Sequence, residues 1–460
     1  MGESPPASRY HAAMAFDRSE LELLDQALEV LARGFEHLPD APATFDRARA
    51  RDVLREAAER MQDNYPYHHP LYIGQMLKPP HPVALIAYAL AMWINPNNHA
   101  LDGGRASSAM EKEAVAAIAR MFGWETHLGH LCGGGTMANF EALWVAREIR
   151  PGKAIAASSQ AHYTHRRLSE VLGVEFHEIP VDDRGRMSVT ALESVLASGA
   201  VGTVVTTLGT TAAGTVDPLP EVLALRERHD FRIHVDTAYG GYFTLASNLG
   251  SETRAAFDAI PYADSIAVDP HKHGLQPYGC GCVLFRDPSV GRFYKHDSPY
   301  TYFTSGDVHM GEISLECSRA GAAAVALWTT MRMLPLERGG EFARGLEAGR
   351  EAALMLHRLL TADERFAPLM TPELDIVTWV VRAPSASQAS AEARRIFAAA
   401  ARRDLHLAVA SFPRALVEGS GAVGSWDADA VACLRACVMK PEHREWIPEI
   451  VQRLAAATAD

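Results

Sequence analysis

The stretch "SIAVDPHKHGLQPYGCGCVLF", residues 265–285, places a lysine between two short apolar runs. "SIAV" and "CGCVLF" have the composition of buried strands, and the proline and glycine residues between them indicate a connecting turn. The chain has six lysines, and only Lys272 follows a predicted core strand. Burial there disfavours the ammonium form and favours an amine that attacks an aldehyde. The alternative is a lysine whose long side chain reaches solvent from the strand end.

Short β-rich runs alternate with helical patterns from about residue 100 onward. The runs "KAIAASS", "VGTVVTTLGT" and "FRIHVDTAYG" are separated by stretches such as "LPEVLALRERH", whose apolar residues recur with helical period. This alternation predicts an α/β fold with a mostly parallel central sheet and helices on both faces. Ligands of open α/β sheets bind where the strands end, so polar residues at those ends are the candidate functional residues.

The length of 460 residues exceeds the usual ceiling of about 250–300 residues for one hydrophobic core. We predict an N-terminal helical segment at 1–82, which wraps around another part because the prolines of "NYPYHHPLYIGQMLKPPHP" interrupt any helix. A large α/β domain is expected at 83–335. A smaller α+β domain is expected at 336–460, where Ala-, Arg- and Glu-rich helices interleave with "DIVTWVVRA" and "CLRACVM".

The amino-acid composition limits which partners and compartments we expect for the protein. A net charge of −12 argues against binding a nucleic-acid backbone. Six cysteines are too few for a disulfide framework. The longest apolar run, "VALIAYALAMWI", is shorter than the roughly 20 residues of a membrane span, and the amino terminus lacks the pattern of a signal peptide. We therefore expect a cytoplasmic protein with no membrane partner.

Asp236 ends the predicted strand in "FRIHVDTAYGG". A buried carboxylate is costly unless it pairs with a cation. A protonated pyridine nitrogen is one such partner, because the ion pair keeps the ring an electron acceptor. A metal ligand and a helix cap are equally open readings.

The segment "LCGGGTMANFEALWVARE" leads a glycine run into a helix. Glycines at 133–135 allow the backbone to approach an anion, and the amides of Gly135 and Thr136 open the helix. We predict a phosphate site here, although the spacing matches neither GxGxxG nor the nucleotide P-loop.

His162 follows another strand end, in "SSQAHYTHRRL". Its ring is suited to lie flat on an aromatic ring, and a surface histidine at a helix start is the alternative. His162 and His165 also have the spacing of metal ligands, to which the histidines of "YHHP" could add. The glutamate of an HExxH motif is missing and no cysteine is near, so we expect no metal.

In this chain order, and with "TLGTT" at 207–211, these motifs resemble those of the group II pyridoxal-phosphate-dependent amino-acid decarboxylases. The resemblance runs from "YIGQMLKPPHP" to "CLRACVMKP". It implies an aspartate-aminotransferase-like fold (fold type I), pyridoxal 5'-phosphate as cofactor, and a homodimer with active sites at the interface.

The resemblance also implies roles for single residues. Lys272 looks like the lysine of the internal aldimine, Asp236 like the partner of the pyridine nitrogen, and His162 like the histidine stacked over the ring. The cofactor-binding residues implied are Gly135, Thr136, His162, Thr211, Asp236, Ala238, Asp269, His271 and Lys272. Arg435 is similar to the arginine that holds the substrate α-carboxylate, unless it forms a structural ion pair, and Tyr72 is expected to line the side-chain pocket.

Two features depart from the family pattern. Gly133 replaces the usual Ser or Thr, and Met137 replaces a common acidic residue, so phosphate contacts are expected to be redistributed. In "KHDSPYTYFTSGDVHMGEISLECSRAG", the acid that protonates the product carbon is expected to be Tyr300 or His309.

The expected reaction is decarboxylation of an L-amino acid to its amine and carbon dioxide through a Lys272 aldimine. Oxidative decarboxylation to an aldehyde and retro-aldol cleavage are alternatives on the same cofactor. A noncatalytic scaffold would lack Lys272 or Asp236, and both are present. Aromatic and acidic substrates both stay open.

Overall fold

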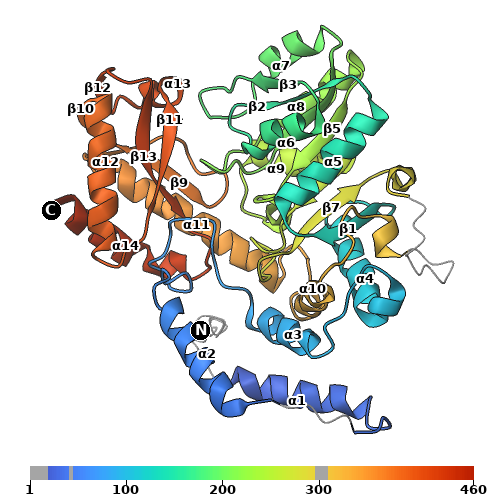
Figure 1. Ribbon diagram of the computed structural model, residues 1–460. Helices are drawn as coiled ribbons and strands as arrows, with labels where there is room; N and C mark the ends of the chain where they lie inside the picture. The colour runs from blue at the N-terminus through green and yellow to red at the C-terminus, as the bar shows by residue number, and fades with distance from the viewer. Residues whose placement is uncertain (1–18, 41–44, 296–308, 460) are drawn as a thin grey trace, which may run out of the picture.

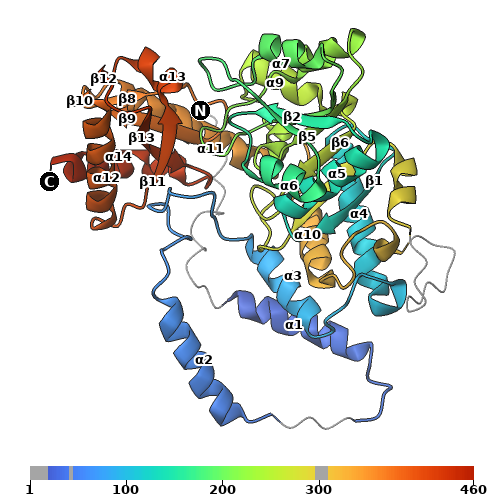
Figure 2. The same cartoon turned by 45° about the horizontal axis from the view of Figure 1, so that its top comes forward.

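The computed structural model describes residues 19–40, 45–295 and 309–459 (Figure 1). The first two helices, α1 (Glu20–Arg33) and α2 (Arg47–Met61), contain no buried residue. In Figures 1 and 2, α2 stands away from the rest of the molecule, and α1 lies beside α3 (Pro82–Met92). The N-terminal helices therefore contribute no side chain to the core of this chain.

The central sheet has seven strands in the order β1-β7-β6-β5-β4-β2-β3. Strands β3, β2, β4, β5 and β6 run parallel, whereas β7 is antiparallel to both β6 and β1. Their bounds are β1 Leu128–Cys132, β2 Ala154–Ser158, β3 Phe176–Ile179, β4 Val201–Thr207, β5 Arg232–Asp236, β6 Ser265–Val268 and β7 Gly281–Phe285. The predicted mostly parallel sheet is confirmed.

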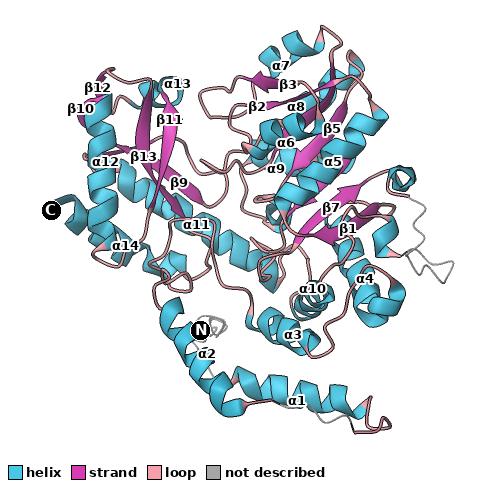
Figure 3. Cartoon of the chain, in the orientation of Figure 1, coloured by secondary structure: helices cyan, strands magenta, loops and turns pink. Residues whose placement is uncertain are grey.

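Both faces of this sheet are covered (Figure 3). Successive strand side chains point to opposite faces, so neighbours on β4 enter different cores: Val204 packs in the largest cluster, and Val205 packs with helices α5 and α6. This double burial explains why the strands read as continuous apolar runs. The other helices of this part are α4 Arg105–Met121, α5 Gly135–Ile149, α6 Thr164–Leu172, α7 Val189–Leu196, α8 Leu219–Ala224, α9 Ser251–Asp258 and α10 Gly321–Met333.

The long helix α11 (Glu341–Thr361) leads from the large sheet to a smaller α+β part (Figure 1). A four-stranded antiparallel sheet there has the order β11-β13-β9-β8. The apolar face of α11 packs with Trp379, Leu434 and Ile450 in a separate core cluster. The elements are β8 Phe366–Pro368, β9 Ile376–Val381, β10 Ala383–Ser385, α12 Ala386–Ala401, β11 Ala408–Pro413, α13 Arg414–Val417, β12 Val423–Ser425, β13 Ala430–Cys437 and α14 His443–Ala459.

The smaller C-terminal α+β part therefore agrees with the predicted fold class. The boundaries at 82 and 335 remain predictions. Among the described residues, no helix is long and apolar enough to cross a bilayer.

Candidate active site

Lys272 lies in the turn between β6 and β7, beyond the end of β6 at Val268. Its Nζ atom is 3.0 Å from Oδ2 of Asp269, and the lysine side chain is 22% exposed whereas Asp269 is 2% exposed. The position thus differs from the expected buried strand end, because the turn carries the lysine away from the strand. A buried carboxylate fixes the amine instead.

The turn is anchored to the start of β7 through His271. Its backbone amide donates to the carbonyl of Cys280 over 3.0 Å, and its Nδ1–H donates to the same oxygen over 2.8 Å. Burial lowers the pKa of His271, against the opposing charge of Asp269. The imidazole therefore holds the turn as a neutral hydrogen-bond donor.

The glycine-rich segment meets this turn at the start of α5. Gly134 has φ +146°, a conformation that favours glycine, and α5 begins at Gly135. A Cβ atom on Gly135 would lie 2.8 Å from Oδ2 of Asp269 and 3.1 Å from Cβ of Ala238. The first amides of a helix have no partner within the helix and attract anions, as predicted for Gly135 and the exposed Thr136.

Asp236 ends β5, and His165 holds its carboxylate. Nε2 of His165 is 2.8 Å from Oδ2, and the amide of Ala238 donates to Oδ1 over 3.0 Å. Burial alone would raise the pKa of Asp236, but the hydrogen bond and charge of His165 lower it below the usual range. The carboxylate is therefore ionised at neutral pH. The sequence carries no signal for this pair, because the spacing of His162 and His165 suggests only metal ligands.

His162 precedes α6 and belongs to the same cluster. Its Nδ1 atom contacts Oγ1 of Thr164, and its ring is half-buried. Burial lowers its pKa most, and the charges of Asp236 and Lys272 act on it in opposite directions. A neutral ring at this place can pack its face against another aromatic ring.

Arg435 on β13 reaches across from the smaller part and is 4% exposed. Its guanidinium donates to the carbonyls of Ala212 (3.0 Å), Gly74 (3.3 Å) and Thr211 (2.8 Å). No described Asp or Glu forms an ion pair with it, which differs from the ion pair considered as the alternative. Thr211 is exposed in the loop after β4 and contacts Arg435 through its backbone.

Of the remaining predicted residues, Tyr72 and His309 make their contacts elsewhere, and Tyr300 is not among the described residues. Tyr72 is buried, its hydroxyl accepts from the amide of Gln75 over 3.4 Å, and its ring lies 4.9 Å from that of Tyr67. His309 is fully buried and its Nδ1 accepts from the amide of Leu101 over 3.1 Å. Tyr300 lies outside the described residues.

The converging groups match pyridoxal phosphate in three respects. The α5 terminus suits its phosphate, the Lys272 amine suits its aldehyde, and the ionised Asp236 suits a protonated pyridine nitrogen. Two buried atoms, Oδ1 of Asp269 and Nδ1 of His165, have no hydrogen-bond partner among the described residues. The residues present therefore fit the cofactor. No group of three or more potential metal ligands occurs in the described part of the chain.

Residues 66–382 match the family described as "Pyridoxal-dependent decarboxylase conserved domain", which is more than half of the chain. The L-tyrosine decarboxylase of Enterococcus faecium is 28% identical over 463 residues, covering 77% of this chain and 76% of that protein. The L-aspartate decarboxylase of Thermococcus kodakarensis is 30% identical over 288 residues, covering 62% of this chain and 73% of its own length.

Solved structures show the same fold. Mouse CSAD in its apo form has a TM-score of 0.76 at 21% identity, covering 97% of this chain and 93% of its own. Oryza sativa TDC with PLP and tryptamine has a TM-score of 0.77 at 17% identity, covering 96% and 98%. With the family match, these structures confirm the type I fold. The chain belongs to the pyridoxal-dependent decarboxylase family and is a pyridoxal-phosphate-dependent carboxy-lyase that acts on an amino acid.

Proposed function

We propose that the enzyme converts an aromatic L-amino acid to its amine and carbon dioxide at the cluster of Lys272, Asp236 and His162. When bound, pyridoxal phosphate supplies an aldehyde that captures the substrate amine and a ring that accepts electrons from the breaking bond. The observation that carries the proposal is the buried Asp236 carboxylate, which His165 holds at 2.8 Å at the end of β5, because a carboxylate in this position keeps a pyridine nitrogen protonated.

The side chains and backbone amides of the chain hold the cofactor in place. Lys272 presents the amine that holds the cofactor, and Asp269 fixes that amine at 3.0 Å. The α5 amides at Gly135 and Thr136 would bind the phosphate. His162 and Ala238 would pack against the ring of the bound cofactor and exclude water from it.

Arg435 is proposed to bind the substrate α-carboxylate. Three backbone carbonyls orient its guanidinium but leave the charge without a carboxylate partner among the described residues. A guanidinium is always charged and can donate further hydrogen bonds, so a substrate carboxylate would complete the site. Binding of the carboxylate there would fix the orientation of the substrate in the site.

The proton that replaces carbon dioxide is proposed to come from Tyr300, with His309 as the second candidate. The imidazole of His309 is engaged at Nδ1 by Leu101 and fully buried, so a loop tyrosine is better suited to reach a substrate carbon.

An aromatic substrate is favoured by aromatic rings next to the Arg435 contact at Gly74. Tyr65 lies 4.8 Å from His406, and Tyr67 lies 4.9 Å from Tyr72, measured between ring centroids. Such rings pack well against an aromatic side chain. The name of the Enterococcus faecium relative points to the same substrate class.

A homodimer in the cytoplasm is the proposed form. Leu21, Val30, Leu54 and Met61 on α1 and α2 are each more than half exposed, as is Trp93 after α3. Exposed apolar side chains on these helices are available for an interaction, and a second copy of this chain is the proposed partner.

The experiment is carbon dioxide release by the purified holoenzyme with L-tyrosine, L-phenylalanine, L-tryptophan, L-aspartate and L-glutamate, with the second product identified. We expect release from an aromatic substrate and one amine per carbon dioxide. Release from L-aspartate alone would contradict the substrate class. An aldehyde with hydrogen peroxide would contradict the amine outcome and leave the carboxy-lyase intact.

A further inference from the structure

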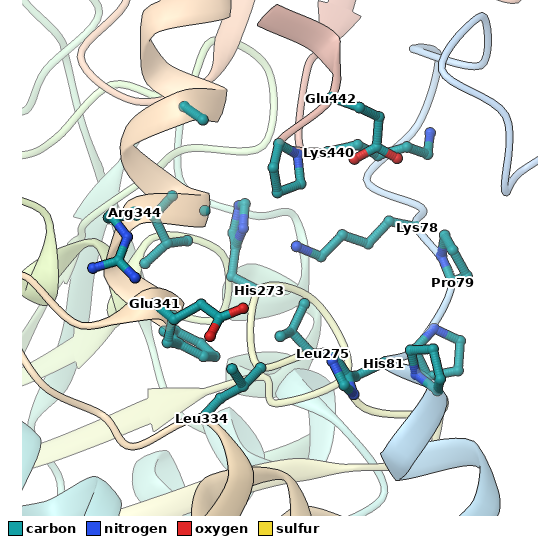
Figure 4. A pocket seen from close by; sticks show the side chains of 17 residues that line it. Lys78, Pro79, His81, His273, Leu275, Leu334, Glu341, Arg344, Lys440 and Glu442 are labelled. Atoms are coloured by element: carbon teal, nitrogen blue, oxygen red, sulfur yellow. The ribbon is translucent and has the colours of Figure 1, made fainter. Parts of the chain in front are cut away.

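A cavity of about 140 Å³ lies where three distant segments meet. The N-terminal segment at 78–82, the start of α11 and the loop at 440–442 after β13 line it, together with His273 and Leu275 from the Lys272 turn (Figure 4). None of the residues proposed above to hold the cofactor or the substrate carboxylate lines this cavity. Exposed Glu341 on its wall makes it reachable from solvent.

Charged groups of both signs surround the cavity. Figure 4 shows the amine of Lys78 lying between the carboxylates of Glu341 and Glu442, which come from two other segments of the wall. The Lys78 amine donates only weakly to the carbonyl of Met439, over 3.4 Å, and forms no ion pair among the described residues. By contrast, the amine of Lys440 donates to the carbonyl of Tyr72 over 2.8 Å.

His273 gives the cavity a polar atom without a partner. The side chain is 1% exposed, and neither ring nitrogen has a hydrogen bond among the described residues. Its Nε2 faces Oδ2 of Asp375 at 3.3 Å. Burial lowers the pKa of His273 well below its usual value, so the ring enters the cavity wall as a neutral group. A buried polar atom left unmatched is costly, and a bound polar molecule would remove that cost.

The rest of the wall is apolar. Pro79, Pro80, Leu275, Leu334 and Phe342 contribute it. We propose that this cavity is a second binding site for an α-amino acid, separate from the Lys272 centre. The Lys78 amine binds the carboxylate of the ligand, Glu341 binds its ammonium, and the apolar wall receives its side chain. Such a ligand links the N-terminal segment to α11 and to the smaller part.

The test uses the full-length holoenzyme and its melting temperature, because a ligand that binds only the folded state raises that temperature. L-Valine is the probe, with isovalerate and isobutylamine as its two singly charged halves. Lys78→Met removes the carboxylate partner, and Gly345→Leu fills the cavity, since a Cβ on Gly345 has ordinary contact with Pro441 at 3.4 Å. Arg435→Gln alters the proposed substrate site instead.

We expect L-valine to raise the melting temperature saturably and more than either half. Lys78→Met and Gly345→Leu should each weaken L-valine binding by about tenfold or more, which corresponds to one lost polar contact, whereas Arg435→Gln should retain it. The proposal is overturned if no rise occurs, if either half binds as well as L-valine, or if the rise persists in Gly345→Leu. Loss of binding in Arg435→Gln also overturns it, because the binding would then belong to the substrate site.

Discussion

The Nε2 atom of His165 lies 2.8 Å from Oδ2 of Asp236, and both side chains are buried. The contact joins the first turn of α6 to the end of β5, and the two residues are 71 positions apart in the sequence. It sets the charge of Asp236 before any cofactor binds. His165 is thus a positioning residue for the carboxylate that the chemistry requires.

Replacing His165 with phenylalanine leaves Asp236 buried without its hydrogen-bond partner. We expect His165→Phe to lower the free energy of unfolding at pH 7 by about 2–3 kcal/mol, the usual worth of a hydrogen bond to a charged group. Urea unfolding of His165→Phe, Asp236→Asn and the double variant measures the coupling. Additive effects would show that the two side chains do not interact.

The same variant has a defined pH dependence. In the wild type the pKa of Asp236 is lowered, so its stabilisation is fully present above the unfolded value of about 3.9 and is lost only as pH falls through the folded pKa. In His165→Phe, burial dominates and raises the pKa, so protonation relieves a buried charge. The stability difference between the two proteins should therefore shrink as pH falls from 7 to 4. A constant difference would contradict this assignment.

A substitution at Gly135 tests the predicted phosphate site. A Cβ there would come within 2.8 Å of Oδ2 of Asp269, so Gly135→Ala must displace the turn or the start of α5. We expect pyridoxal phosphate to bind at least about tenfold more weakly, equivalent to about 1.4 kcal/mol. Gly419→Ala is the matched control, because nothing lies within 4 Å of its added Cβ. Absorbance titration of the apo proteins measures both, and equal affinities would place the phosphate elsewhere.

Much of this arrangement is readable from the sequence, for a physical reason. Strands buried on both faces must be apolar throughout, so β2, β4, β5, β6 and β7 stand out, and residues such as Asp236 can be placed at their ends. The partner of Asp236 is not readable, because it depends on which helix crosses which strand end. The same holds for Arg435, whose three carbonyl partners come from segments 223, 224 and 361 residues away. The partial exposure of Lys272 depends on the path of one turn.

Arg435→Gln separates carboxylate binding from structural support. Loss of three backbone contacts should lower the free energy of unfolding by about 3 kcal/mol. If the residue also holds the substrate carboxylate, KM for the amino acid rises by about tenfold or more while inhibition by the amine product, which has no carboxylate, is unchanged. Steady-state kinetics with both compounds decide this, and a parallel loss of amine inhibition would indicate a structural role alone.

The burial of Lys440 predicts that its contribution to the free energy of unfolding increases at alkaline pH. Burial lowers its pKa from 10.5 to about 7, and Glu442 opposes the shift. Between these values the unfolded chain binds a proton that the folded chain does not, so the stability contributed by Lys440 rises with pH. The free energy of unfolding of the wild type, minus that of Lys440→Met, should increase by about 1.4 kcal/mol per pH unit from pH 7 to 9. Lys153→Met, at an exposed lysine, is the control, and a flat difference for Lys440→Met would refute the prediction.

The central claim is that Lys272 is the residue that holds the cofactor. The most direct measurement is borohydride reduction of the holoenzyme followed by peptide mass mapping of the pyridoxyl group. The account predicts one modified residue, Lys272, and no incorporation in Lys272→Ala. Modification of Lys78 or Lys440 in place of Lys272, or the same incorporation in Lys272→Ala, would contradict it.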